Sequence, residues 1–333
     1  MKVNPVRVNA SPFIGQHCET TATGTLLGQL GTHLSEPMLF GLGQGLGFVF
    51  WNMKTMPFPF IGGRIKPDLL TANIAHHLGM ELRVQETSSR TKAWEGVKSL
   101  LDAGKAVGLK LDCFHLDYFT DPIHFAGHYV AILGYNEQSA FLVDTVQQGS
   151  QVVTSLQSLE RARNERGPMS SRNLWYTLEK CAPEGHTAQA LERAVRAAIR
   201  SNAAEYLQPP IKNLGYQGIE KASREIVKWF DRTDDRTEFA AAATLMERAG
   251  TGGALFRNLY RDFLLEAAEL TGAEPIGAAH AEFVAIAQNW SEISALFEQV
   301  AQTGERQDIL QAAERLRELS VVEKSAMQHL AAV

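Results

Sequence analysis

The chain has 333 residues, of which 45% are hydrophobic and 21% charged, and its net charge is −5. This length is sufficient for two domains that each bury a hydrophobic core, and the negative charge argues against general nucleic-acid binding. The N-terminal residues lack the apolar segment of a signal peptide, and the apolar region 40–60 is broken by Gly, Asn, Lys and Pro, so we expect a cytoplasmic protein that does not enter a membrane.

The first predicted element is a helix that begins at Cys18. Apolar residues recur with helical spacing over 22–30, and Gly31 is a suitable C-terminal cap. The positive end of the helix dipole at such a position favours a thiolate, the reactive form of cysteine. Cys18 is therefore a candidate nucleophile. The other cysteines, Cys113 and Cys181, form no Cys-x-x-Cys motif, which argues against a disulfide framework or a zinc site.

A glycine-rich run follows at 41–47. Its glycines alternate with other residues, unlike a G-x-G-x-x-G motif, and the Gly-Lys-Ser/Thr of a phosphate-binding loop is absent from it. We expect a loop or strand at which backbone segments approach closely, with the lining of a substrate channel as the alternative.

Residues 94–104 and 106–112 predict a helix and the strand that follows it. Two histidines and two aspartates lie beyond them, at 115–124, with no spacing typical of metal ligands. We therefore expect no metal, and a solvated loop. The alternative is a loop that contacts a cationic amine substrate through Asp117 or Asp121.

Two β-rich runs joined by a polar turn predict a hairpin over 128–144. His128 begins its first strand and Asp144 ends its second, so both side chains return to the same end. Cross-strand neighbours lie about 5 Å apart, but a one-residue slip in register would place the two side chains on opposite faces. An aspartate that accepts from one imidazole nitrogen leaves the other free to take a proton from Cys18. Each of the three residues alone is more often structural, whereas the three together indicate a catalytic triad.

A basic segment at 161–172 contains Arg161, Arg163, Arg166 and Arg172. Such a cluster would attract an acidic partner protein to the entrance of the site. The alternative is a solvated charged face.

After a short predicted strand at 173–178, the pattern becomes entirely helical. The segment 250–257 is expected to help form a substrate pocket, in which Arg257 holds a phosphate or carboxylate; an interhelical turn with an ordinary ion pair is the alternative. We expect a mixed domain over 1–182 and a helical domain over 187–333. The predicted helices of the second domain are 188–207, 217–230, 238–249, 254–270, 278–301 and 306–330.

Three stretches of the chain resemble the N-terminal domain of the butirosin biosynthesis protein H family: FIGQHCE at 13–19, LSEPMLFGLGQGL at 34–46 and HFAGHYV at 124–130. The order of a cysteine on a helix, a histidine on a strand and an aspartate on the next strand also resembles the papain-like cysteine hydrolases, including the bacteriocin-processing type. The resemblance implies an α+β, papain-like catalytic domain followed by an all-α helical domain.

The resemblance further implies acyl transfer from an acyl-carrier-protein thioester to an amine of a small-molecule acceptor, by way of an S-acyl cysteine. Cys18 would attack the thioester, His128 would act as base and then acid, and Asp144 would orient His128. The arginines of 161–172 would then dock the acyl carrier protein. Phosphopantetheine would arrive on that donor, and no other cofactor would be needed.

One departure concerns the oxyanion hole. Papain-like enzymes carry a glutamine six residues before the cysteine, where this chain has Pro12. The backbone N–H of Cys18 is the main candidate donor, with Gln16 as a second and His17 packed in support.

Two other function classes stay open at this point. A papain-like hydrolase, peptidase or amidase would use the same triad with water as the final nucleophile. A non-catalytic binding module would merely pack the three residues. The sequence leaves the acyl group, the acceptor and the choice between a monomer and a homo-oligomer open.

Overall fold

The computed structural model describes residues 5–53, 56, 58–120, 123–167, 169–181 and 187–333. The contacts divide the chain into two compact units. The first comprises Met1–Leu39 and Ile74–His186, and the second comprises Phe40–Asn73 and Thr187–Val333. The expected mixed N-terminal region and helical C-terminal region are confirmed.

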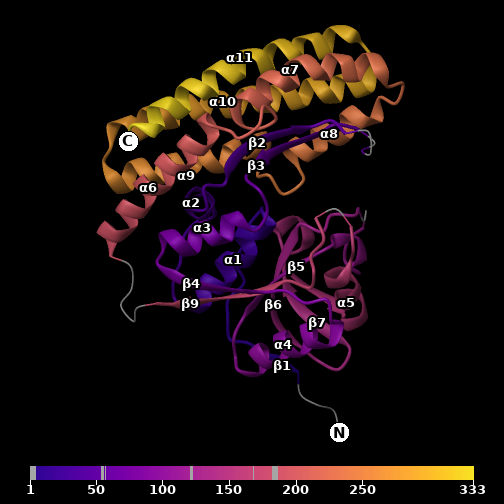
Figure 1. Cartoon of the computed structure of the whole chain (residues 1–333), viewed down its shortest axis with the longest axis vertical. Coiled ribbons are helices and arrows are strands. Elements are labelled where there is room, and N and C mark those ends of the chain that lie inside the picture. The colour runs from indigo at the N-terminus through magenta and orange to yellow at the C-terminus, as the bar shows by residue number, and fades with distance from the viewer. Residues whose placement is uncertain (1–4, 54–55, 57, 121–122, 168, 182–186) are drawn as a thin grey trace. The chain divides into compact units, whose positions relative to one another are not determined.

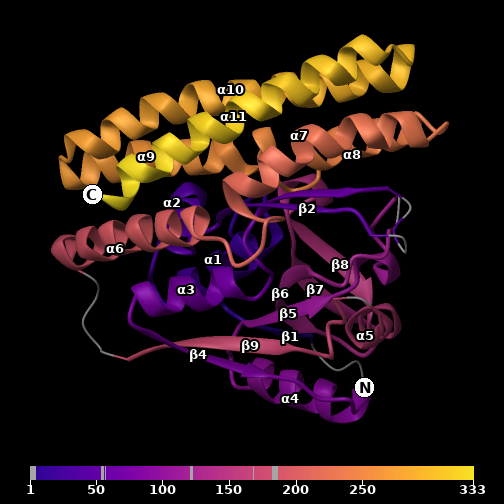
Figure 2. The same ribbon diagram turned by 45° about the horizontal axis from the view of Figure 1, so that its top comes forward.

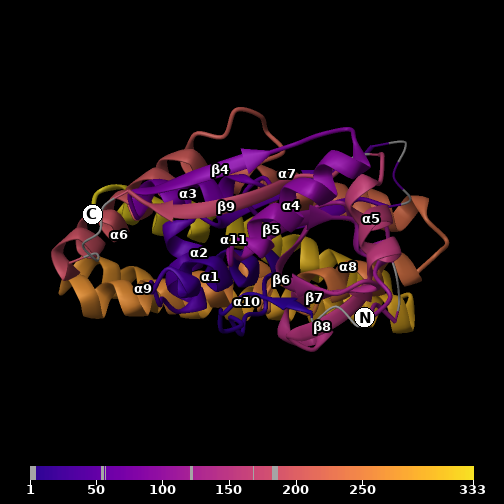
Figure 3. The same cartoon turned by 90° about the horizontal axis from the view of Figure 1, so that it is seen from below.

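A seven-stranded antiparallel sheet forms the centre of the first unit (Figure 1). Its strand order is β4-β9-β5-β6-β7-β8, and β1 pairs with β6. Figure 3 shows β4, β9 and β5 side by side. The strands are rich in branched and aromatic residues, which pack well on a pleated surface. Their bounds are Val6–Arg7 (β1), Met80–Gln85 (β4), Val107–Leu111 (β5), His128–Tyr135 (β6), Ser139–Val143 (β7), Gln151–Ser155 (β8) and Trp175–Lys180 (β9).

Helix α1 (Cys18–Gln29) packs on β5 and β6 and is buried on every side from Cys18 to Leu27. Two of its threonines bond their hydroxyls to backbone carbonyls of the preceding turn: Thr21 donates to the carbonyl of His17, and Thr25 to that of Thr21. Helix α1 begins at Cys18, as predicted. The unit also contains α4 (Arg90–Asp102), α5 (Leu156–Asn164) and short helical turns at Cys113–His115 and Val146–Gln148, while α2 (Glu36–Leu42) and α3 (Leu69–His77) each span a boundary between the units.

A β-bulge sets the register of the β6–β7 hairpin. Gly134 pairs with Phe141, but Ile132 pairs with Leu142, so Leu133 is an extra residue in β6. The register beyond the bulge places Asp144 opposite Val130, two residues from His128. Because side chains alternate along a strand, His128 and Asp144 share one face. Without the bulge they would lie on opposite faces.

The second unit is an assembly of helices joined to one hairpin. Helix α10 packs against α8, α9 and α11, and α11 packs against α6 and α7. Figure 2 shows α10 and α11 running side by side. The bounds are Ala188–Leu207 (α6), Gly215–Arg232 (α7), Thr237–Glu247 (α8), Arg257–Thr271 (α9), Glu274–Thr303 (α10), Arg306–Ala331 (α11), Leu46–Trp51 (β2) and Phe60–Arg64 (β3).

The β2–β3 hairpin belongs to this second unit, whereas the sequence analysis placed it in the first domain. Hydrogen bonds tie it to the helical segments: the amide of Asn213 donates to the carbonyl of Phe50 at 2.7 Å, and the amide of Asn202 donates to that of Leu46 at 2.8 Å. The expected close backbone approach in the run 41–47 is also present. A Cβ on Gly47 would lie 2.9 Å from the carbonyl carbon of Arg64.

The predicted helix 254–270 is interrupted by a left-handed turn. Ala254, Leu255 and Phe256 have φ angles of 49°, 50° and 73°, and all three are buried. Such a conformation costs a non-glycine residue roughly 1–2 kcal/mol. The guanidinium of Arg257 supports the turn by donating to the carbonyl of Leu255 at 2.8 Å.

Arg257 and Glu323 form a fully buried ion pair in the second unit. Two guanidinium nitrogens donate to the two carboxylate oxygens, at 2.9 and 2.8 Å. Trp290 Nε1 donates to the same carboxylate at 2.5 Å, and so does the hydroxyl of Tyr206. The pattern of residues 250–257 predicts a substrate-binding Arg257. That expectation is corrected here, because the guanidinium is bound to Glu323 inside the core.

Replacing Arg257 by Met is expected to lower the free energy of unfolding by about 3–5 kcal/mol, because the carboxylate of Glu323 would stay buried without its cation. The double variant Arg257→Met/Glu323→Leu removes both charges and should lose less. Chemical denaturation of the full chain measures both. Arg306→Ala, which breaks an exposed ion pair with Asp231, is the control and should change stability little. A single variant as stable as the parent would contradict the structural role of this pair.

Candidate active site

His128 and Asp144 are joined by a hydrogen bond of 2.8 Å between Nε2 and Oδ2. His128 is buried and Asp144 has no exposed surface. Oδ1 of Asp144 also accepts from the backbone N–H of Thr145 at 2.6 Å. With Nε2 directed at Asp144, the remaining ring nitrogen, Nδ1, is available for proton transfer.

Cys18 completes the group from the first position of α1. Its thiol is a hydrogen-bond partner of His128 and contributes to the electrostatic environment of that ring. The structure therefore brings together Cys18, His128 and Asp144, contributed by α1, the start of β6 and the residue after β7.

The charges of this group favour a protonated imidazole. Burial works to lower the pKa of His128, but the negative charge of Asp144 and hydrogen bonds to Asp144 and Cys18 raise that pKa well above its usual value. Burial opposes ionisation of Asp144 as well, yet the charge of His128 and hydrogen bonds from three donors hold the pKa of Asp144 below its usual value. A histidine that stays protonated at neutral pH stabilises a neighbouring thiolate.

Glu36 occupies the N-terminus of α1 and was not anticipated from the sequence. Its carboxylate accepts the backbone N–H groups of Gln16 and His17, the latter at 2.8 Å, and the hydroxyl of Thr20 at 2.8 Å. The negative carboxylate offsets the positive end of the helix dipole. The helix dipole is therefore a weaker source of positive charge at Cys18 than the sequence pattern predicts.

The residues before Cys18 are also tied to the residues after Asp144. The carbonyl of Gly15 accepts the N–H of Val146 at 2.9 Å. A Cβ on Gly15 would lie 2.5 Å from Thr21 Oγ1, so glycine is needed for this close approach. Gln16 has an exposed side chain, and its backbone N–H is bound to Glu36. His17 is buried as the N-cap residue of α1.

The segment between β5 and β6 adds Tyr118, which the sequence analysis also missed. Its hydroxyl donates to Asp144 Oδ2 at 2.7 Å. The neighbouring Phe119 contacts the ring of His128 edge-on, with ring centroids 5.5 Å apart. The tyrosine is 26 residues from Asp144 in a segment without regular periodicity, so no local sequence signal identifies it.

Cys113 is a second thiol in the electrostatic environment of the triad. It is buried, and its Sγ donates to the carbonyl of Ile123 at 3.3 Å. Burial raises the pKa of the Cys113 thiol to about 11. Cys113 is therefore held as a neutral thiol, which distinguishes it chemically from Cys18.

Of the two aspartates proposed for substrate binding, the structure describes only Asp117. Asp117 is exposed, and its Oδ2 accepts from the hydroxyl of Thr154 and, at 2.8 Å, from the N–H of Ser155. These bonds fix the start of α5 and give Asp117 a structural task. Asp121 lies outside the described residues.

The fold exposes three of the four arginines of the basic segment 161–172 and buries the fourth. Arg161, Arg166 and Arg172 are exposed, and Arg172 pairs with Glu86 at 3.4 Å. Arg163 is buried, and its guanidinium donates to the carbonyls of Ala93 and Asn173. Burial lowers the pKa of Arg163 to about 10. Arg163 is thus withdrawn from the expected docking surface, because α5 turns that side of the helix toward the sheet.

The histidines of 115–124 form separate pairs. His115 Nε2 lies 2.7 Å from Glu165, and His124 Nδ1 lies 3.1 Å from Asp112. Over the described part of the chain, no group of three or more His, Cys, Asp or Glu side chains is placed to hold a metal ion.

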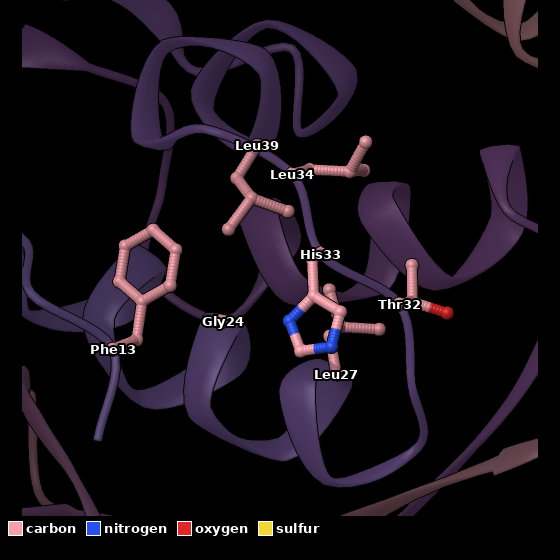
Figure 4. Close-up of a pocket in the computed structure, with 7 residues that line it drawn as sticks. All are labelled: Phe13, Gly24, Leu27, Thr32, His33, Leu34 and Leu39. Atoms are coloured by element: carbon pink, nitrogen blue, oxygen red, sulfur yellow. The ribbon is translucent and has the colours of Figure 1, made fainter. Parts of the chain in front are cut away.

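Figure 4 shows a small pocket beside α1 that does not belong to this site. Leu27 lies nine residues from Cys18, which is about 180° around the helix. The pocket is therefore on the opposite side of α1 from Cys18. Its lining is mostly apolar and consists of Phe13, Gly24, Leu27, Thr32, His33, Leu34 and Leu39.

Two family models match the chain. "Butirosin biosynthesis protein H, N-terminal" matches residues 17–145, which begin next to Cys18 and end next to Asp144. "Domain of unknown function (DUF4872)" matches residues 157–330. No curated protein matches the chain. Among the described residues, no helix combines the length and apolar character needed to cross a bilayer.

The raised pKa of His128 leads to a prediction about Cys18 in a Cys181→Ser background. At pH 6, iodoacetamide should label Cys18, and His128→Asn should slow that labelling more than tenfold, because the imidazolium that stabilises the thiolate is lost. The difference should shrink as the pH passes about 8.5, where thiolates form without help. Mass spectrometry of the digested protein measures the rates. Cys113 is the internal control and should stay unlabelled; labelling of Cys113 as fast as Cys18 would contradict the assignment.

Proposed function

Because the chain belongs to the butirosin biosynthesis protein H family, we propose that it is a cysteine-dependent acyltransferase of natural-product biosynthesis. Family membership indicates a biosynthetic enzyme. The observation that carries the finer proposal is the position of His128 between Asp144 and Cys18. We further infer that the first unit is a papain-like domain, and its three free cysteines support action in a reducing cytoplasm.

In the first half-reaction the thiolate of Cys18 attacks the carbonyl carbon of an acyl-carrier-protein thioester. The carbon–sulfur bond to the carrier breaks, and the imidazolium of His128 gives its Nδ1 proton to the departing thiolate. The product is an S-acyl Cys18 and a carrier with a free phosphopantetheine thiol. The backbone N–H of Cys18, at the first position of a helix, is the proposed oxyanion donor.

In the second half-reaction an amine of a small-molecule acceptor attacks the S-acyl carbonyl. His128, now neutral, takes the proton of the attacking amine, and the bond to Cys18 Sγ breaks to regenerate the thiolate and the imidazolium. Asp144 holds the ring through Nε2 in both steps. A hydrolase would use the same first step with water in place of the amine.

Intact-protein mass spectrometry tests the acyl-enzyme. Incubation with an acyl-carrier-protein thioester should add one acyl mass, located on Cys18, and Cys18→Ala should show none while Cys113→Ala still does. Addition of an aminoglycoside amine should discharge the adduct as an amide faster than buffer alone discharges it as an acid. Faster release of the free acid would favour the hydrolase, and no adduct with any donor thioester would contradict the proposal.

Arg161 and Arg166 are exposed and support docking of the acidic carrier protein. The double variant Arg161→Glu/Arg166→Glu should raise KM for the carrier-bound donor about tenfold, because like charges would then face each other. KM for a small acyl thioester that lacks the carrier should not change. Arg317→Glu, an exposed change on α11, is the matched control. An equal effect on both donors would argue against docking at this surface.

A further inference from the structure

Tyr118 and His128 share one acceptor atom. The hydroxyl of Tyr118 lies 2.7 Å from Asp144 Oδ2, and Nε2 of His128 lies 2.8 Å from the same oxygen. A carboxylate oxygen has two lone-pair directions, so the two donors together fill them. Because Asp144 has no exposed surface, water does not compete for either direction.

The fold holds Tyr118 in place from both ends of its segment. Asp112, directly after β5, accepts the backbone N–H groups of Phe114 and Phe125, each at 3.0 Å, and so draws the two ends of the segment together. Between them, Phe119 packs its ring edge-on against His128. One segment therefore supplies both a hydrogen bond to the carboxylate and a packing contact to the imidazole.

A second donor at the carboxylate changes the imidazole as well. A hydrogen bond from a hydroxyl takes up part of the negative charge of a carboxylate, so less of that charge acts on the other partner. An imidazolium therefore holds its proton more tightly when its buried carboxylate partner accepts no hydrogen bond from a second donor. A general acid held too tightly is slow to give its proton away, since efficient proton transfer needs a matched proton affinity.

We propose that Tyr118 is a positioning residue that fixes the orientation of Asp144 and, by sharing its charge, tunes how readily His128 releases a proton. This proposal rests on the proposed function, because it concerns the same His128–Asp144 pair. Tyr118 acts through Asp144 Oδ2, the oxygen that also accepts from His128.

The titratable surroundings of His128 favour this role. Among the described residues, they include Cys18 from α1, Asp144 after β7, and Cys113 with Tyr118 from the segment after β5. Cys113 is kept neutral by burial. Burial and the charge of Asp144 raise the pKa of Tyr118 well above its usual value, so its hydroxyl remains a neutral donor. Asp144 and Cys18 are thus the groups whose charge bears on His128, and Tyr118 moderates the first of them.

The test follows the protonation of His128 in the full chain by NMR of ¹⁵N-labelled histidine, without any acyl donor. Tyr118→Phe keeps the ring and removes the hydroxyl, so His128 should lose its proton at a pH about one unit higher than in the parent. Replacing Tyr118 by 3-fluorotyrosine strengthens the donor and should shift the transition in the opposite direction. This second variant also keeps the test decisive if Tyr118→Phe does not fold.

Tyr135→Phe is the matched control, because the hydroxyl of Tyr135 also donates to an aspartate, Asp102, at 2.6 Å. The control should leave the titration of His128 unchanged. An unchanged or lowered transition in Tyr118→Phe, or a shift in the same direction for both Tyr118 variants, would overturn the proposal. Acyl-enzyme formation without these shifts would reject the role of Tyr118 alone, whereas the expected shifts without an acyl-enzyme would reject the acyltransferase alone.

Discussion

The candidate site of the first unit depends on one buried hydrogen bond, between His128 and Asp144. A carboxylate with no exposed surface is tolerated only where charge and donors compensate for its lost hydration. The surrounding structure supplies them: the ring of His128, the hydroxyl of Tyr118 and the N–H of Thr145. The bond between Gly15 and Val146 then ties the loop before Cys18 to the residues after Asp144. Cys18 and His128 are thereby held by one continuous set of contacts.

Local patterns in the sequence were sufficient to predict the helix that carries Cys18 and the hairpin that carries His128, but not how these side chains are arranged in space. The helix that starts at Cys18 and the hairpin that starts at His128 follow from periodicity and turn residues. Whether His128 and Asp144 face each other depends on the bulge at Leu133, next to Gly134. A Cβ on Gly134 would lie 2.2 Å from the carbonyl oxygen of Val6 in β1. That neighbour is more than 120 residues away in the chain, so no local window contains the information.

Residues whose role depends on a distant partner were the ones that pattern analysis misjudged or missed. The local sequence does not distinguish Arg163 and Arg257 from the exposed Arg161, yet the fold buries both. Glu36 lies in the family-like stretch 34–46 and Tyr118 lies in no such stretch, and both act through backbone or side-chain contacts that only the tertiary structure creates. The long helices of the second unit, in contrast, are set by periodicity within each segment, and α6 has the predicted bounds.

The assignment of Phe40–Asn73 to the second unit has a consequence for synthesis on the ribosome. The β2–β3 hairpin leaves the ribosome well before Asn202 and Asn213, to which its backbone is bonded. At about 5–20 residues per second, the roughly 140 residues between the hairpin and Asn202 take about 7 to 30 seconds. A two-stranded hairpin is at best marginally stable alone. The nascent chain therefore carries an apolar hairpin without its helical partners during this interval, and its second unit can be completed only after α11 has been made.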